Sequence, residues 1–284
     1  MKKITYLILI LAIFSCQEED SNGIPAYIKI DKISVIDTTI NSSTTDTSTY
    51  KSVTDAWVSI NEINKGVHEL PAIFPVLDNG NVEVRVYAGI KDNGISAQRI
   101  NYAFYNSYTE NTTLSPDSIT IINPIVIVKE NISGQFDDFD NSYSFNSDSC
   151  CFQKESNGPY GNYGSLTLVD SILITEISYQ DHPLSFNDVP QQGSPTYLEL
   201  DYKNNTRFLV GLYINSLNSP TVEKGLLWIN PKEDWNKIYI NLTETVTESV
   251  GAENFSVFIK LQRDFDLNEN KLDFDNIRII HYEK

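Results

Sequence analysis

The sequence predicts an all-β protein built from two antiparallel β-sandwich domains. Short apolar segments alternate with a period of two and are separated by turn residues at intervals of roughly 8–12 residues, while a helical period occurs at one place only. The chain of 284 residues is long for one domain and comfortable for two. A stretch rich in Asp, Asn and Ser divides it. We therefore expect a first sandwich over residues 24–128, a linker over 129–144 and a second sandwich over 145–284.

The amino-terminal residues have the layout of a secretory signal peptide. Lys2 and Lys3 precede an apolar run from Ile4 to Phe14, and Ser15-Cys16 and an acidic polar string follow. The run is too short to span a bilayer core of about 30 Å, and no later stretch approaches the roughly twenty apolar residues that a spanning helix needs. We therefore expect residues 1–15 to be a cleaved leader and residues 16–23 to be a tether.

The cysteine after this run resembles that of the lipobox of bacterial lipoproteins. The matching residues are Ile13-Phe14-Ser15-Cys16, and Phe14 is bulkier than the small residue usual at its place. The resemblance implies that the Cys16 thiol is diacylated and the new amino terminus acylated, with chains such as palmitate, which would hold the protein stably on a membrane. The alternative is an ordinary cleavable signal peptide with an incidental cysteine.

The residues after Cys16 indicate in which membrane the protein is held and on which side of it. Gln17 stands where an Asp marks inner-membrane retention in many Gram-negative lipoproteins, so the resemblance implies the outer membrane. Glu18-Glu19-Asp20 is similar to the short export tag of Bacteroidota lipoproteins, which implies a position on the cell surface. The alternative for this acidic string is a solvated tether.

Composition excludes one class of partner. The chain has 38 acidic and 21 basic residues and a formal net charge of −17, and a protein this acidic is repelled by nucleic acid phosphates. The same negative charge does not exclude the binding of cations. With Cys16 acylated, only Cys150 and Cys151 remain, either as a strained vicinal disulfide or as buried thiols. Two adjacent cysteines are no disulfide framework, so stability must come from packing.

The first domain reads as short strands joined by turns. Ile28 and Ile30 alternate with Lys29 and Asp31, which indicates a half-buried strand. Asp78-Asn79-Gly80-Asn81 predicts a hairpin turn, because Asn and Gly tolerate positive φ. The expected strands lie within residues 24–35, 53–60, 67–70, 82–87 and 118–128, the last one broken by Pro124. In pattern and position this unit resembles the immunoglobulin-like or carboxypeptidase-regulatory-like modules of bacterial surface proteins, which implies a spacer.

The second domain is also rich in expected strands. Leu242, Val246 and Val250 recur every four residues before Gly251, which predicts one short helix. Expected strands include residues 164–169, 172–177, 196–202, 207–214, 225–229, 235–242, 255–261 and 272–280. This count of strands around one helix predicts a jelly roll of two packed sheets.

The closing segment Asp275-Asn276-Ile277-Arg278-Ile279 and the strands 197–202 and 207–214 resemble those of concanavalin-like and carbohydrate-binding-module jelly rolls of secreted bacterial proteins. The resemblance implies carbohydrate as the ligand class. Sandwiches of this shape host many functions, so the fold does not settle the function.

An enzyme is disfavoured. Glu199-Leu200-Asp201 resembles the Glu-x-Asp core of concanavalin-like endoglucanases, but the second glutamate that such a site needs is replaced by Lys203 and Asn204. We therefore expect Glu199 and Asp201 to form the solvated face of an ordinary strand. His68, His182 and His281 lack zinc-ligand spacing, and the sequence has no serine-hydrolase, zinc-protease or phosphate-loop motif.

A structural calcium ion is a second implication of the jelly-roll resemblance, with Asp273 or Asp275 as ligands. The acidic loop that starts at Asp264 echoes a calcium loop but lacks the glycine at its sixth position and the glutamate at its twelfth. The alternative is a solvated loop.

Sugar binding needs exposed aromatic faces together with hydrogen-bonding groups. For Trp235 a core position is expected, because it opens an alternating strand. The sequence thus predicts a lipid-anchored outer-membrane protein with a non-catalytic, carbohydrate-binding jelly roll, and the alternative is a structural or assembly component of an envelope complex. Its candidate sugar-binding residues are Trp228, Tyr160, Tyr163 and Tyr213.

Overall fold

The computed structural model of the chain describes residues 23–37, 53–140, 151–168, 171–178, 186 and 189–284. Within these ranges the protein is almost entirely β-structure. The described elements are the strands β1 to β20 and one helix, α2 (Thr243–Glu248). The all-β sandwich class is therefore confirmed, and the short helix lies where the four-residue spacing predicts it.

The first domain packs two layers of strands against each other. A sheet of order β5-β1-β9, extended by the pair β10-β2, faces a five-stranded sheet of order β4-β3-β6-β7 with β8 on β6. The β1–β9 and β2–β10 ladders are parallel, which alternation alone does not predict. The strands are β1 (Ala26–Ile30), β2 (Ser34–Ile36), β3 (Asp55–Ile60), β4 (Ile63–Glu69), β5 (Ala72–Val76), β6 (Gly80–Lys91), β7 (Arg99–Asn101), β8 (Tyr108–Leu114), β9 (Ile119–Ile121) and β10 (Ile125–Ile127).

The expected hairpin at residues 78–81 is wrong. Gly80 does adopt a positive φ of 74°, so the backbone turns as predicted. However, β5 pairs with β1 while β6 pairs with β3, so the turn carries the chain from one sheet to the other. A turn signal predicts a change of direction, whereas the pairing of the two strands depends on where the rest of the sheet lies.

The second domain is a sandwich with the strand exchange of a jelly roll. One sheet has the order β12-β13-β20-β15-β18 with β11 on β20, and the other has the order β14-β19-β16-β17. The strands are β11 (Ile132–Asp137), β12 (Phe152–Gly158), β13 (Gly161–Leu168), β14 (Ile174–Ser178), β15 (Thr196–Asn204), β16 (Phe208–Ser216), β17 (Val222–Ile229), β18 (Lys232–Asn241), β19 (Ala252–Gln262) and β20 (Asn270–Tyr282).

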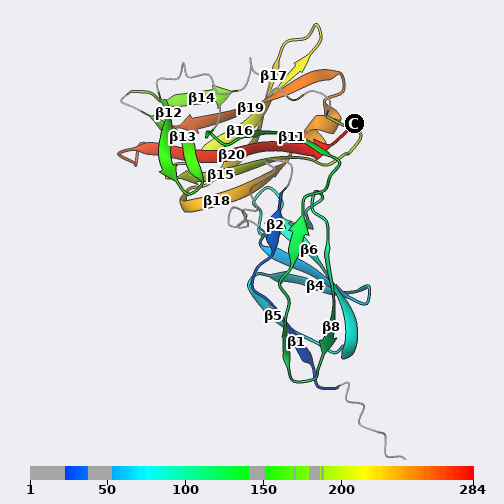
Figure 1. Cartoon of the computed structure of the whole chain (residues 1–284). Helices are drawn as coiled ribbons and strands as arrows, with labels where there is room; N and C mark the ends of the chain where they lie inside the picture. The colour runs from blue at the N-terminus through cyan, green and yellow to red at the C-terminus, as the bar shows by residue number, and fades with distance from the viewer. Residues whose placement is uncertain (1–22, 38–52, 141–150, 169–170, 179–185, 187–188) are drawn as a thin grey trace, which may run out of the picture.

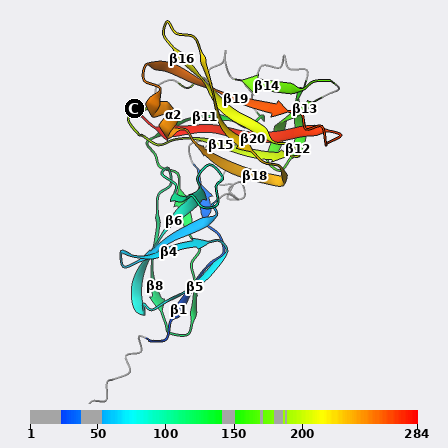
Figure 2. The ribbon, with the colours of Figure 1, turned by 180° about the vertical axis from the view of Figure 1, so that it is seen from behind.

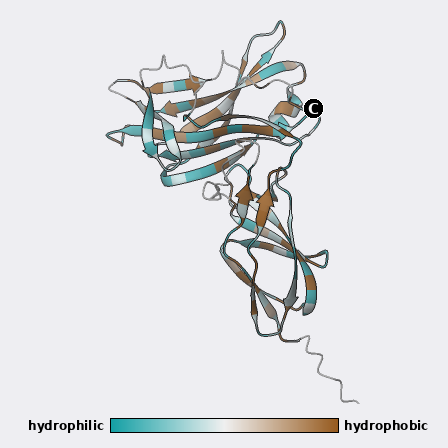
Figure 3. Ribbon diagram, viewed as in Figure 1, coloured by the Kyte–Doolittle hydropathy of each residue, from teal (hydrophilic) through white to brown (hydrophobic). Residues whose placement is uncertain are grey.

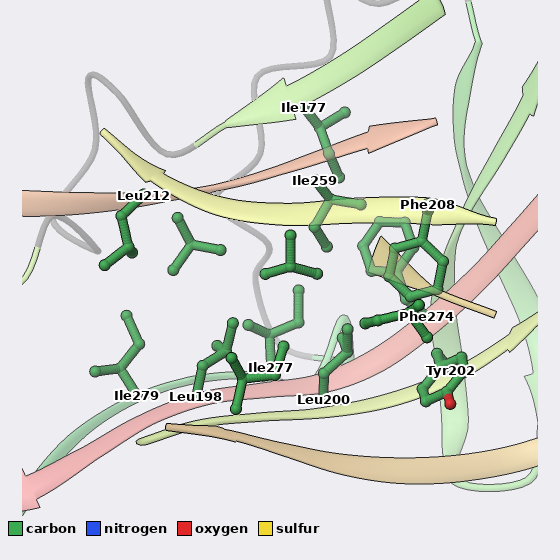
Figure 4. Close-up of a cluster of buried hydrophobic side chains, with 14 of the residues drawn as sticks. Ile177, Leu198, Leu200, Tyr202, Phe208, Leu212, Ile259, Phe274, Ile277 and Ile279 are labelled. Atoms are coloured by element: carbon green, nitrogen blue, oxygen red, sulfur yellow. The ribbon is translucent and has the colours of Figure 1, made fainter. Parts of the chain in front are cut away.

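The core of the second domain lies between these two sheets (Figure 4). Alternate residues of each strand point into it, as the period of two predicts. The side chains that Figure 4 labels are Ile177, Leu198, Leu200, Tyr202, Phe208, Leu212, Ile259, Phe274, Ile277 and Ile279, and all are buried.

The predicted linker over residues 129–144 is only partly a linker. Within it, β11 pairs antiparallel with β20 from Ile132 opposite Tyr282 to Asp137 opposite Ile277, and Phe139 is buried in the second core. The second domain thus begins earlier than composition indicates. An edge strand is held by its backbone hydrogen bonds, so Ser and Gln side chains do not prevent it.

The two domains meet end to face (Figures 1 and 2). One end of the first domain contacts the outer face of the sheet that holds β15, β18 and β20, and β1 lies at the opposite pole. Tyr197, Tyr239 and Ile280 of the second domain join the buried cluster of the first. Figure 3 colours β2, near this contact, as strongly hydrophobic. The junction is therefore continuous with the core of the first domain.

We predict that Leu200→Ala lowers the free energy of unfolding by about 2–5 kcal/mol, because Leu200 is fully buried between the sheets. The matched control is Leu217→Ala, whose parent side chain is 67% exposed and whose loss should change stability by less than about 0.5 kcal/mol. Denaturant unfolding followed by tryptophan fluorescence measures both. Equal losses in the two variants would contradict the assignment of the core.

Candidate functional site

The carboxylates singled out in the sequence are buried at the domain junction. Glu199 is 1% exposed and Asp201 is 2% exposed, so the expected solvated face of β15 is wrong. Glu199 accepts a hydrogen bond of 2.6 Å from the hydroxyl of Tyr102 in the first domain and lies 3.0 Å from the ammonium of Lys237. Alternation correctly separates the two faces of β15, but it cannot show that another domain covers the outer one.

Charge compensation at this junction decides the ionisation of Glu199. Burial by itself raises the pKa of this carboxyl, but Lys237, Arg278 and the hydrogen bond from Tyr102 outweigh burial and leave the pKa below its usual value. Arg278 also forms a buried ion pair with Asp37 of the first domain. Glu199 is therefore an ionised, paired group that holds two domains together.

Tyrosine side chains fill the remainder of the junction. The Tyr102 ring lies 4.8 Å from Tyr105, 5.4 Å from Tyr197 and 4.8 Å from Tyr239, measured between ring centroids. The hydroxyl of Tyr197 donates to Asp92 over 3.0 Å. Aromatic packing with satisfied hydroxyl groups is typical of a stable interface.

The two candidate metal ligands lie on the same sheet face but in different surroundings. Asp273 accepts a hydrogen bond of 2.7 Å from Ser165 and lies 3.1 Å from the ammonium of Lys271. Asp275 is fully buried, and its Oδ2 has no hydrogen-bond partner among the described residues. Burial raises the pKa of Asp275 to about 8, and Asp201 adds to this increase by charge repulsion.

Within the described ranges, no three His, Cys, Asp or Glu side chains converge as a metal site would require. Asp273 is already neutralised by Lys271, so it is a poor ligand for a further cation. A calcium ion bound by Asp275 stays a prediction. The acidic segment 264–270 instead bonds to itself, since the amides of Asp264 and Asp266 donate to Asn270 and Asp264.

The four candidate sugar-binding aromatics do not come together. Tyr160 lies in the turn between β12 and β13, and Tyr163 follows on the outer face of β13. Tyr213 lies on the outer face of the opposite sheet, bonded to Glu176 and packed on Phe258. Trp228 lies near the end of the edge strand β17. The sequence therefore identified candidates in three separate places.

Trp235 is not a core residue, contrary to expectation. Its ring meets Tyr163 edge to face at 5.5 Å on the outer side of the sheet, and it is partly exposed. In this edge-to-face contact, one ring covers part of the face of the other. This aromatic pair is therefore less suited to stacking on a sugar than an isolated exposed indole would be.

A groove of about 450 Å³ opens at the domain junction beside β17 and β18, and we call it the junction groove. Its volume lies within the range of roughly 300–1,000 Å³ that is typical of small-molecule sites, and domain interfaces are a preferred place for such sites. The first domain contributes Thr54, Lys91, Asn93, Gly94, Ile95 and Ser96, and the second contributes Tyr202, Leu227, Trp228, Ile229, Asn230, Pro231, Lys232, Asn236, Lys237, Ile238 and Tyr239.

Trp228 is the aromatic side chain that remains open to this groove. It is 43% exposed, and the guanidinium of Arg207 lies 4.9 Å from its ring, which holds the indole in place through a cation–π contact. The neighbouring core residue Ile229 anchors the end of β17. Of the four predicted ligand-binding residues, Trp228 is the one in the lining of the junction groove.

Hydrogen-bonding groups line the same groove. The amide nitrogen of Asn236 donates to the Tyr202 hydroxyl over 3.1 Å, and the backbone N–H of Asn93 donates to the Tyr239 carbonyl over 2.9 Å. These bonds fix both walls of the groove. Asn93, Asn236 and Lys232 carried no signal in the sequence, because Asn93 shares a groove with the two β18 residues only when the domains dock.

Several sequence candidates lie elsewhere. Cys16, Cys150 and His182 are outside the described residues, and Cys151 is buried. His68 stacks on Phe74, and His281 is buried on β20, far apart in the fold. Across the described ranges, no helix has the length and apolarity needed to cross a membrane.

Comparison with known proteins gives only remote similarities. No family model and no curated protein matches the chain. A β-sandwich carbohydrate-binding module of promiscuous specificity is 10% identical, with 78% of this chain and 83% of that one covered and a TM-score of 0.35. The family 30 carbohydrate-binding module of a Clostridium thermocellum cellulosomal cellulase is 14% identical, with 51% and 90% covered and a TM-score of 0.36.

A third similar structure is the enzymatically active domain of tailspike protein 4 of bacteriophage CBA120, at 12% identity and a TM-score of 0.36. The match covers 52% of this chain but 19% of that protein. At such values none of the three similarities decides a function. The lipoprotein signal and the immunoglobulin-like character of the first domain stay predictions.

We predict that Asp275 makes the stability of the protein fall as the pH rises from about 4 to about 8. An unfolded aspartate loses its proton near pH 4, whereas folded Asp275 keeps it up to about pH 8. Its stabilising contribution is therefore fully present below about pH 4 and is lost as the pH rises through 8. Asp275→Asn removes this titration, so the variant should be more stable than the wild type at pH 9.

Thermal unfolding at pH 5, 7 and 9 measures this effect. The control is Asp266→Asn, which replaces an exposed carboxylate and should leave the pH slope of the wild type unchanged. Parallel curves for wild type and Asp275→Asn would show that Asp275 does not titrate in this range.

Proposed function

We propose that this protein is a lipid-anchored outer-membrane protein, facing the cell surface, whose second domain binds carbohydrate without catalysis. The observation that carries the proposal is the junction groove, whose lining combines the half-exposed indole of Trp228 with side-chain amides and hydroxyl groups from both domains. Sugar recognition requires this combination, because a pyranose presents an apolar C–H face to an aromatic ring and hydroxyl groups to polar side chains.

The state of the carboxylates supports a non-catalytic role. A glycosidase needs two accessible carboxylates on either side of the scissile bond. Glu199 and Asp201 are both buried, and Glu199 is bonded to Tyr102 of the first domain and to Lys237. The groove itself has no Asp or Glu in its described lining. Binding is therefore the better proposal for this groove.

The shape of the molecule supports the proposed anchoring. The described chain enters the first domain at β1, at the pole away from the second domain (Figure 1). A lipid on Cys16 would thus hold the protein through the far end of the first domain. In that arrangement the first domain acts as a spacer and the junction groove stands away from the membrane.

We predict that Trp228→Ala reduces glycan binding by about tenfold or more, a loss of about 1.4 kcal/mol, because it removes the aromatic face on which the sugar stacks. A glycan array followed by titration calorimetry on the best hit measures the loss. Trp235→Ala is the matched control, since it removes an indole outside the groove. Equal loss in both variants, or no glycan bound by the wild type, would contradict the proposed site.

We predict that Cys16→Ser releases the protein from the membrane pellet into the soluble fraction, because no acyl chains can be attached to a serine side chain in this pathway. Fractionation of cells followed by mass spectrometry of the amino terminus measures the release. A Cys16→Ser protein that stays in the pellet as the wild type does would show that something other than lipidation holds it.

A second candidate function is that of a structural component of an envelope complex. It is favoured by an apolar face on the first domain, where the side chains of Ile119, Ile121, Ile125 and Ile127 are between 45% and 56% exposed. No charged residue occurs from Ser118 to Val128. Such a face is typical of protein contacts. Recovery of one defined envelope protein that is lost with Ile121→Lys, without any glycan signal, would favour this candidate over the first.

A further inference from the structure

The charge of the junction groove differs from that of the protein. The whole chain has 38 acidic and 21 basic residues. By contrast, the described lining of the groove contains Lys91, Lys232 and Lys237 and no acidic residue. A cation-rich hollow in an acidic protein is unexpected from composition, and it suggests a ligand of opposite charge.

Not all of these lysines are available to a ligand. Lys91 lies 3.0 Å from Glu69, and Lys237 lies 3.0 Å from buried Glu199. Lys232 is exposed and makes no ion pair with any described residue. Its backbone N–H donates to the Asn204 side chain over 2.9 Å, which fixes the start of β18 at the edge of the groove. Lys232 is thus the lining cation whose charge is not neutralised.

A second cation, Arg207, contacts the indole of Trp228 from outside the described lining of the groove. Arg207 lies over Trp228 at 4.9 Å and forms no ion pair with a described carboxylate. A guanidinium that stacks on an aromatic ring still directs N–H donors outward, and these match the geometry of carboxylate and sulfate groups. Two cations without an ion pair to a described carboxylate therefore lie at the groove, Lys232 in its lining and Arg207 against the indole of Trp228.

We propose that the junction groove selects saccharides that carry an anionic group, either the carboxylate of a uronic acid or a sulfate ester. The sugar ring stacks on Trp228, and its anionic group is bound by Lys232 and Arg207. This inference rests on the proposed glycan binding and adds the class of glycan. Neutral sugars satisfy the stacking contact but leave both cations without a partner, so they bind more weakly.

An array that holds neutral, uronic-acid and sulfated glycans tests the class. We expect the mature protein to bind charged members, with the uronic-acid and sulfated sets showing which anionic group is preferred. Titration calorimetry then compares the strongest hit with the same oligosaccharide after methyl esterification or desulfation, and removal of the charge should weaken binding about tenfold or more. Hits confined to neutral glycans would overturn this inference but not glycan binding. An array without hits would overturn both.

Substitution of Lys232 tests the placement. Lys232→Gln should lower the affinity for the charged oligosaccharide and so reduce the preference for charge, with Arg207 retaining part of it, while the affinity for the neutral form stays as in the wild type. Trp228→Ala should weaken both forms. Lys32→Gln, which replaces an exposed lysine outside the groove, is the matched control and should change neither. A Lys232→Gln protein that unfolds at the same temperature as the wild type and keeps the full preference for charge would overturn the placement.

Discussion

The contact between Glu199 and the Tyr102–Lys237 pair is the constraint on which the arrangement of the two domains depends. A carboxylate at this depth is costly unless it is both neutralised and hydrogen-bonded, and here the second domain supplies the ammonium while the first supplies the hydroxyl. Separation of the domains would return Glu199 to water but expose the surrounding tyrosine cluster. The relative orientation of the domains is thus fixed by groups that are satisfied only when both domains are present, and the junction groove exists because of that orientation.

The sequence is informative about the fold wherever one strand face is buried. Val82, Val84 and Val86 of β6, and Leu198 and Leu200 of β15, are buried as their alternation predicts. The same reasoning fails where a segment becomes a strand because it pairs with another strand and has no alternating pattern of its own. The segment at 132–137 has little apolar periodicity and becomes β11 through its ladder with β20. The pairing of β5 with β1, rather than with β6, is likewise a property of the assembled sheet.

The site was harder to predict than the fold. Trp228 was recognisable as a candidate because indole rings suit sugar faces, but nothing local separated it from Tyr213, which is bonded to Glu176 on the opposite sheet. Asn93 and Lys232 are distant in sequence and meet only across the junction. For Glu199 the sequence predicted a solvated strand face, and it could not show that Tyr102 of the other domain covers this carboxylate and makes it a buried structural ion.

The groove has one wall from each domain, and this limits how its ligand preference can change during evolution. Recombination that exchanges either domain for a foreign module would supply only one wall of the groove. It would also leave Glu199 or Tyr102 without its hydrogen-bond partner. Variation in ligand preference would then have to come from point changes around the rim, at positions such as Asn230 or Ser96, and not from shuffling of whole modules.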